Sequence, residues 1–173
     1  MGHQIHSKMK KLNPKAMRES YSETTEIILP ADLNTNKSLF GGTLVSYVDK
    51  ISAITAYRHT GTAVTTLSID HLIFQRPVPE GAILTLRAGV NRVFKTSLEV
   101  GCKVTMQAPK DGIFEDLHVC TAYLTFVAIG ENQKATSPVP VFGETSDEIR
   151  RFEQALIRRD ARFKLKETMV SHK

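Results

Sequence analysis

From residue 63 to residue 129 the chain alternates between apolar and polar positions with a period of two. This pattern is typical of strands that bury one face of an antiparallel sheet. The alternating segments are Ala63–Phe74, Ala82–Val93 and Thr96–Met106. In the first of them, the alternation assigns Leu67, Ile69 and Ile73 to the apolar face. Leu117–Ile129 is apolar on both faces, which indicates a central strand, and a shorter strand is predicted at Glu23–Leu29.

One long helix is predicted to precede these strands. No glycine or proline interrupts the segment from Thr43 to Thr60, and Gly61 stands where a C-terminal cap belongs. Apolar residues extend nearly all round the helix and leave a narrow polar strip, so we expect burial on most sides. A helix followed by consecutive strands indicates an α+β fold, with an antiparallel sheet wrapped around one long central helix.

The two ends of the chain differ from this central part. Residues 1–20 are predicted to form a flexible leader, residues 21–130 the domain, and residues 131–173 a linker with a basic C-terminal helical extension. Thr145 and Glu148 fit a capping box at the start of that helix. Its predicted buried stripe consists of Ile149, Phe152, Leu156 and Phe163.

The composition narrows the possible partners and location. The chain has 173 residues, of which 41% are hydrophobic, and a formal net charge of +5. No apolar run is long enough to span a membrane and no secretory signal is present, so we expect a cytoplasmic protein without a membrane partner. The charge favours anionic partners, but no zinc-finger spacing or aromatic-rich basic stripe indicates nucleic acid. Cys102 and Cys120 are too few for a disulfide framework and are interpreted as core residues.

Two features of the predicted helix suggest chemistry. Asp49 lies off the polar strip, where a carboxylate is unfavourable unless it is paired or functional. Gly41 and Gly42 precede the helix, where free N–H groups can polarise a carbonyl and glycine lets a ligand approach the backbone. Taken singly, Asp49 is more simply a hydrogen-bonded structural residue and the glycine pair a turn. Asn34, in the polar loop just before them, makes a shared site the stronger hypothesis.

Short motifs follow one another in a specific order between residues 23 and 130. They are Pro30-x-Asp32-x-Asn34, Phe40-Gly41-Gly42-x-Leu44, Asp49, Ala56-x-Arg58-His59, Thr66-x-Ser68-x-Asp70, Phe74-x-x-Pro77-Val78-x-x-Gly81 and Thr96-Ser97-x-Glu99-Val100. In order and spacing they resemble the signature of the hotdog-fold acyl-CoA thioesterases, in particular the single-domain bacterial acyl-CoA hydrolases. The resemblance implies a hotdog fold and the hydrolysis of acyl-CoA to a free fatty acid and CoA.

The resemblance also implies a role for each site residue. Asp49 would act as general base or nucleophile, facing Asn34 of another subunit, and the N–H of Gly42 would stabilise the oxyanion. The residues that it implies for binding the substrate or its CoA part are Gly41, Lys95, Thr96 and Ser97, and then Arg58 and His59. No metal and no cofactor beyond the CoA of the substrate is expected. The assembly implied is a homodimer, and a hexamer built as a trimer of dimers.

Three alternatives stay open at this point. The first is a non-catalytic acyl-CoA sensor on the same scaffold, which would not need both Asn34 and Asp49. The second is a dehydratase acting on acyl carrier protein substrates, for which neither His59 nor His71 is well placed. The third is a nucleic-acid-binding module, supported only by the positive charge, which salt-dependent DNA binding would reveal.

Overall fold

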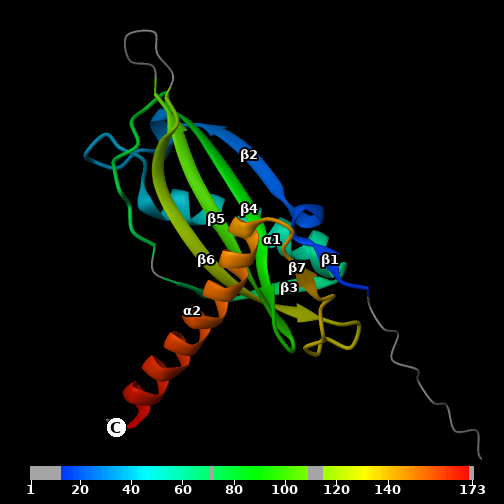
Figure 1. The fold of residues 1–173 in the computed structure, drawn as a ribbon. Coiled ribbons are helices and arrows are strands. Elements are labelled where there is room, and N and C mark those ends of the chain that lie inside the picture. The colour runs from blue at the N-terminus through cyan, green and yellow to red at the C-terminus, as the bar shows by residue number, and fades with distance from the viewer. Residues whose placement is uncertain (1–12, 71, 109–114, 172–173) are drawn as a thin grey trace, which may run out of the picture.

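Five strands form one antiparallel sheet that curls around a single helix (Figure 1). This computed structural model describes residues 13–70, 72–108 and 115–171. The strands, in their spatial order, are β2 (Ser22–Ile27), β4 (Ile83–Val93), β5 (Ser97–Gln107), β6 (Leu117–Ile129) and β3 (Ala63–Ile69). The helix, α1, spans Gly41–Thr60. The predicted α+β architecture is therefore confirmed.

The core lies between the inner face of the sheet and one side of α1. Alternate residues of β4, β5 and β6 are fully buried, as the period-two pattern predicts. They include Leu84, Leu86, Leu98, Val100, Leu124 and Phe126, and they face Leu44, Val48 and Ile51 of α1. The prediction of a central strand at Leu117–Ile129 is correct in that β6 is paired on both sides, although β5 is the middle strand.

The strand β3 departs from the predicted pattern. The strand ends at Ile69, five residues before the predicted end at Phe74, so Ile73 lies beyond it. Leu67 and Ile73 are 64% and 69% exposed, and Ile69 is exposed as well, so the prediction that this apolar set faces the core is wrong. The reason is twofold: β3 is the terminal strand of the sheet, and its register shifts in a bulge between Thr66 and Ser68. A bulge re-aims the side chains on either side of it.

The helix α1 begins two residues earlier than predicted, at Gly41, and ends as predicted at Thr60. Gly61 adopts the left-handed conformation with φ of 66°, and its N–H donates to the Tyr57 carbonyl at 2.8 Å. The expectation of burial on most sides fails at Ile54, which is exposed, whereas Tyr57 is exposed as part of the predicted polar strip. One apolar side of α1 is therefore left open beside β3.

The end of the predicted leader is part of the fold. β1 (Lys15–Ala16) pairs in parallel with β7 (Val141–Phe142), and the short helix η1 (Met17–Ser20) follows it. Ala16, which pairs with Phe142, and Met17, which joins the core, are both buried. Residues 13–20 are thus ordered, and the rest of the predicted leader lies outside the described residues. A second short helix, η2 (Pro30–Asp32), opens the loop before α1.

The basic C-terminal segment forms the helix α2 (Ser146–Ser171), which crosses the outer face of the sheet and extends beyond it (Figure 1). The predicted capping box is confirmed: the N–H of Glu148 donates to Thr145 Oγ1 at 3.2 Å, and the Thr145 N–H donates to the Glu148 carboxylate at 3.0 Å. The predicted buried stripe is mostly wrong. Of its members only Phe152 is half-buried; Ile149, Leu156 and Phe163 are exposed.

Two arginines anchor α2 to the sheet. Arg158 donates to both carboxylate oxygens of Glu99 on β5, at 2.6 and 3.1 Å, and its guanidinium lies 3.6 Å from the ring centre of Tyr123. Glu99 is fully buried. Further along, Arg162 donates to both oxygens of Asp70 at 2.6 and 2.8 Å. These arginines are therefore structural contacts of α2, and charge pairing replaces much of the apolar stripe that the sequence predicted.

The two cysteines behave as core residues in the structure. Both are free and buried, and burial raises the pKa of Cys102 to about 12 and that of Cys120 to about 11. Because the reactive form of cysteine is the thiolate, we expect neither thiol to react with a disulfide reagent at pH 8 in the native protein. Spectrophotometric titration should detect both thiols only after unfolding in guanidinium. Stoichiometric reaction of the native protein would contradict this placement.

Candidate active site

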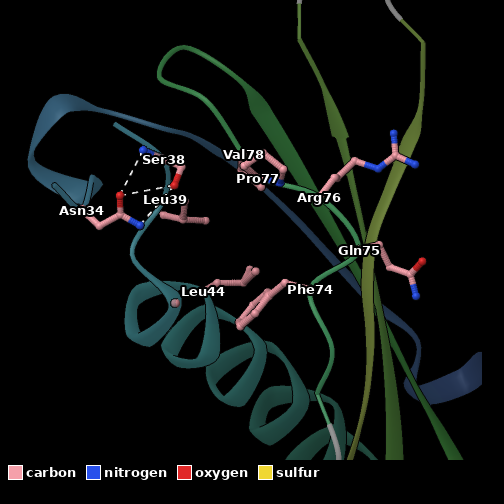
Figure 2. A pocket seen from close by; sticks show the side chains of 10 residues that line it. Asn34, Ser38, Leu39, Leu44, Phe74, Gln75, Arg76, Pro77 and Val78 are labelled. Atoms are coloured by element: carbon pink, nitrogen blue, oxygen red, sulfur yellow. Dashed lines mark hydrogen bonds between the residues drawn. The ribbon is translucent and has the colours of Figure 1, made fainter. Parts of the chain in front are cut away.

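A cavity of about 430 Å³ opens where the Asn34 loop, the start of α1 and the segment after β3 meet. Figure 2 shows Leu44 and Phe74 side by side at its base, with the Asn34 loop on one side and Pro77 and Val78 on the other. The walls are largely apolar, and Asn34 and Ser38 add polar groups at one end. The cavity is suited to a ligand with an apolar part and a hydrogen-bonding head.

The side chain of Asn34 organises its own loop. Its Oδ1 accepts from the N–H of Asn36 at 2.8 Å, and its Nδ2 donates to Ser38 Oγ at 3.1 Å (Figure 2). The backbone of Asn34 also pairs with that of Ser38, at 2.8 Å. These bonds fix the amide at the rim of the cavity, so it needs little reordering to meet a ligand.

The start of α1 has free backbone donors, and its first residue, Gly41, lines the same cavity. The helix has no side-chain cap, and among the described residues the N–H groups of Gly41 and Gly42 meet no acceptor. An added Cβ on Gly42 would lie 2.7 Å from a ring carbon of Phe40, so a side chain there would force the ring to move. A helix N-terminus with free N–H groups favours a negative charge.

Asp49 lies on the third turn of α1 from this end, half-buried, and it has one defined partner. Thr66 of β3 donates its hydroxyl to Asp49 Oδ1 at 2.9 Å. The sequence analysis did not assign Thr66 to the site, although it noted the residue within the Thr66-x-Ser68-x-Asp70 motif. The bulge just after Thr66 explains the omission, because strict alternation did not show which way this side chain points.

Asn34 and Asp49 are not joined within one chain. No hydrogen bond links the two side chains in the described part of the chain. Between and around them, large apolar side chains are exposed on both α1 and the terminal strand β3. This set consists of Phe40, Ile54, Tyr57, Leu67, Ile69, Ile73 and Phe74, which we call the open apolar face. An apolar area of this kind marks an interaction surface.

His59 and Arg58 lie at the other end of α1. The ring of His59 is fully buried; its Nε2 donates to the Val139 carbonyl at 2.8 Å, and its Nδ1 lies 3.3 Å from Ser20 Oγ. Burial lowers the pKa of His59, so the ring is neutral at pH 7 and Nε2 carries the proton. Arg58 is exposed and donates to Ser22 Oγ at 2.9 Å. Of this pair, only Arg58 offers a ligand an accessible group.

The remaining predicted CoA contacts form the hairpin between β4 and β5. Lys95 is exposed at its tip, and the Phe94 N–H donates to the Ser97 carbonyl at 2.7 Å. The carbonyl of Thr96 accepts from the N–H of Ala128 at 3.0 Å. In Figure 1 this hairpin lies at the end of the sheet away from the Asn34 loop. One chain therefore does not bring Lys95, Thr96 and Ser97 to the cavity.

In the described ranges, no three histidine, cysteine or acidic side chains come together as metal ligands would. No described helix has both the length and the apolar character needed to cross a membrane.

Comparison with known proteins gives consistent matches. The sequence pattern of the thioesterase superfamily matches residues 36–113. The chain is 38% identical over 137 residues to Protein VdlD of Helicobacter pylori, covering 79% of this chain and 76% of that protein. It is 38% identical over 133 residues to the uncharacterized acyl-CoA thioester hydrolase YkhA of Bacillus subtilis, covering 76% of each.

Solved structures agree with the sequence matches. An acyl-CoA hydrolase from Staphylococcus aureus, in complex with butyryl coenzyme A, coenzyme A and coenzyme A disulfide, gives a TM-score of 0.80 at 30% identity, over 91% of this chain and 97% of its own. Variants of that protein with an aspartate, a threonine or an asparagine changed to alanine match similarly. A hexameric hotdog-fold thioesterase of Campylobacter jejuni gives 0.63 at 27% identity, over 73% of this chain and 92% of its own.

Proposed function

Because this chain belongs to the thioesterase superfamily and has its hotdog fold, we propose that it hydrolyses acyl-CoA to a free carboxylic acid and CoA. The matched acyl-CoA hydrolase that holds butyryl coenzyme A supports the substrate class. The observation that carries the proposal is the hydrogen bond from Thr66 to Asp49, on the same helix whose first residue, Gly41, lines the cavity with Asn34.

Sequence spacing supports the choice of site residues. In the S. aureus hydrolase, the positions changed to alanine are an asparagine, an aspartate 15 residues later and a threonine 17 residues after that. Asn34, Asp49 and Thr66 have the same spacing in this chain. Thr66 therefore joins the predicted catalytic residues Asn34, Asp49 and Gly42 as a positioning residue for the carboxylate.

The proposed reaction assigns one task to each group. Thr66 holds Oδ1 of Asp49, which leaves Oδ2 free either to take a proton from water or to attack the thioester carbonyl carbon. In the first route the water oxygen forms the new C–O bond, the C–S bond breaks, and CoA leaves as a thiol with the proton that Asp49 took from the water. In the second route the carboxylate forms the C–O bond and the C–S bond breaks; water then protonates the CoA thiolate, and its hydroxide hydrolyses the mixed anhydride and frees Asp49. The Gly42 N–H, at the positive end of α1, stabilises the oxyanion. Asn34 positions the water or the thioester by hydrogen bonding.

A complete site is proposed to need two subunits, since one chain does not join Asn34 to Asp49. The open apolar face and the unpaired edge of β3 adjoin Asp49, and pairing two such edges would bury both. The C. jejuni relative is hexameric, which supports the predicted trimer of dimers. The roles of Gly41, Lys95, Thr96, Ser97, Arg58 and His59 in binding substrate, the cytoplasmic location, and the need for no further cofactor stay predictions.

All three alternatives lose support. A dehydratase needs an accessible histidine, but the ring of His59 is buried with both nitrogens occupied, and His71 lies outside the described residues. A non-catalytic sensor does not require a general base, so the Asp49 carboxylate held by Thr66 argues against it. The third alternative, nucleic acid, is weakened because Arg158 and Arg162 are engaged by carboxylates.

The test is thiol release from acyl-CoAs of short to long chain, followed with a thiol reagent. We expect turnover by the wild type, and none by a folded oligomer would refute the proposal. Co-expression of Asn34→Ala with Asp49→Asn subunits tests the shared site. A mixed dimer then holds one intact site and one doubly altered site, so about a quarter of wild-type activity should return under random pairing.

Each variant expressed alone provides the baseline for this complementation. Activity of the mixed sample that equals the average of the two single variants would show that both residues act within one chain.

A further inference from the structure

The outer face of the sheet, on the side opposite α1, contains a second cavity of about 420 Å³. Its floor is formed where Gly89 of β4 pairs with Gly101 of β5, which in turn pairs with Tyr123 of β6. The absence of side chains at these two positions keeps the surface low: the Asn91 side chain lies over Gly101, and Tyr21 reaches only the margin of Gly89. The first turns of α2 form its roof.

The next row of the sheet places two positive charges side by side. Arg87 of β4 is directly opposite Lys103 of β5, and both line the hollow. Like charges directly opposite on neighbouring strands destabilise a sheet. Glu23 pairs with Arg87 at 2.7 Å, but Lys103 forms no ion pair or hydrogen bond within the described ranges. The arrangement therefore concentrates positive charge at a site where it is unfavourable without a counter-ion.

The roof adds two more cations and a single carboxylate. Arg150 and Arg151 of α2 both pair with Asp147, the latter at 3.2 Å. The Nε of Arg151 is buried and has no acceptor among the described groups. The hydrogen bond from Arg150, followed by the charges of Arg151, Arg150 and Lys103, holds the pKa of Asp147 below its usual value. Three cations thus share one carboxylate around the hollow.

We propose that this hollow binds a small phosphate-bearing anion. A phosphate offers several acceptor oxygens and can accept from the Lys103 ammonium and the Arg151 guanidinium at once. At Gly89 no side chain lies closer than 4.0 Å to the Cβ position, so the anion can approach the sheet there. The hollow is separate from the proposed active site, because the sheet lies between it and α1. Two kinds of molecule carry such a phosphate group: CoA itself, and an unrelated phosphate metabolite.

The test measures the binding of inorganic pyrophosphate by isothermal titration calorimetry, with the full chain and no substrate. We expect saturable binding by the wild type and about tenfold or greater weakening in Lys103→Gln, since one charge-assisted contact is lost. Lys164→Gln makes the same charge change on exposed α2 away from the hollow, so it should bind as the wild type does. Without pyrophosphate, Lys103→Gln should keep or raise its Tm, because the like-charge pair is removed.

A repeat titration in saturating CoA identifies the source. Loss of pyrophosphate binding would support the hollow as a site for CoA phosphates, and unchanged binding would support a separate phosphate metabolite. Absence of binding to the folded wild type, or equal weakening in Lys103→Gln and Lys164→Gln, would overturn the proposal. None of these readouts depends on turnover, so they are independent of whether the protein is a thioesterase.

Discussion

Changing Asp49 to asparagine is expected to lower the turnover of acyl-CoA by about 10²- to 10⁴-fold, the range typical of a lost general base. Asparagine keeps the shape of the side chain and an oxygen that can accept from Thr66, so the local structure should survive. It cannot take a proton from water and it is a poor nucleophile. The loss should therefore occur in kcat, with the affinity for CoA retained, as measured by thiol release and by CoA titration.

A matched control separates this effect from a general loss of charge. Asp160→Asn makes the same change on the exposed side of α2 and should leave turnover unaltered. If Asp49→Asn kept activity within a few-fold of the wild type, the carboxylate would have no part in the chemistry. The free N–H groups at the start of α1 would then be the principal catalytic feature.

The second large effect is on stability. We expect Arg158→Ala to lower the free energy of unfolding by about 3–5 kcal/mol, because it leaves the carboxylate of Glu99 buried without its charged partner. Asn91 still donates to Glu99 at 2.9 Å, but an amide does not neutralise the charge. The contact of the guanidinium with the Tyr123 ring is lost as well. Denaturant unfolding followed by circular dichroism measures the change.

Two further variants test the cause. The double variant Glu99→Gln with Arg158→Ala should be more stable than Arg158→Ala alone, since the uncompensated charge is removed. Arg159→Ala should cost about 1 kcal/mol or less, because that guanidinium only lies over the Phe94 and Phe163 rings near the surface. If Arg158→Ala and Arg159→Ala lowered the free energy of unfolding equally, the ion pair between Arg158 and Glu99 would contribute no more to stability than the surface contacts of Arg159.

Local patterns predicted the elements of this fold well. Gly61 marks the end of α1, and Thr145 with Glu148 marks the start of α2, because a cap depends on residues only a few positions apart. The alternation in β4 and β5 likewise identifies the core face, because it depends only on residues that are two positions apart. The exposure of the apolar residues of β3 was not predicted. The pattern of apolar residues does not reveal whether a partner subunit or the chain's own core covers them.

Contacts between distant residues account for what the sequence did not reveal. Arg162 and Asp70 are 92 positions apart, and Arg158 and Glu99 are 59 apart, so nothing in the basic pattern of α2 identified these partners. Thr66 was visible in a motif, but its role depends on a bulge and on its packing against α1. The candidate positions Asn34, Asp49 and Gly42 were recognised because their motif lies within a short stretch of chain.

The pairing of β1 with β7 has a consequence for the order of folding. Lys15 lies near the start of the chain, yet it pairs with Val141, and His59 bonds the nearby carbonyl of Val139. During synthesis β1 stays unpaired until β7, more than 120 residues later, has left the ribosome. Closing so long a loop carries a large entropy penalty, so this corner forms late, after the sheet has collapsed onto α1.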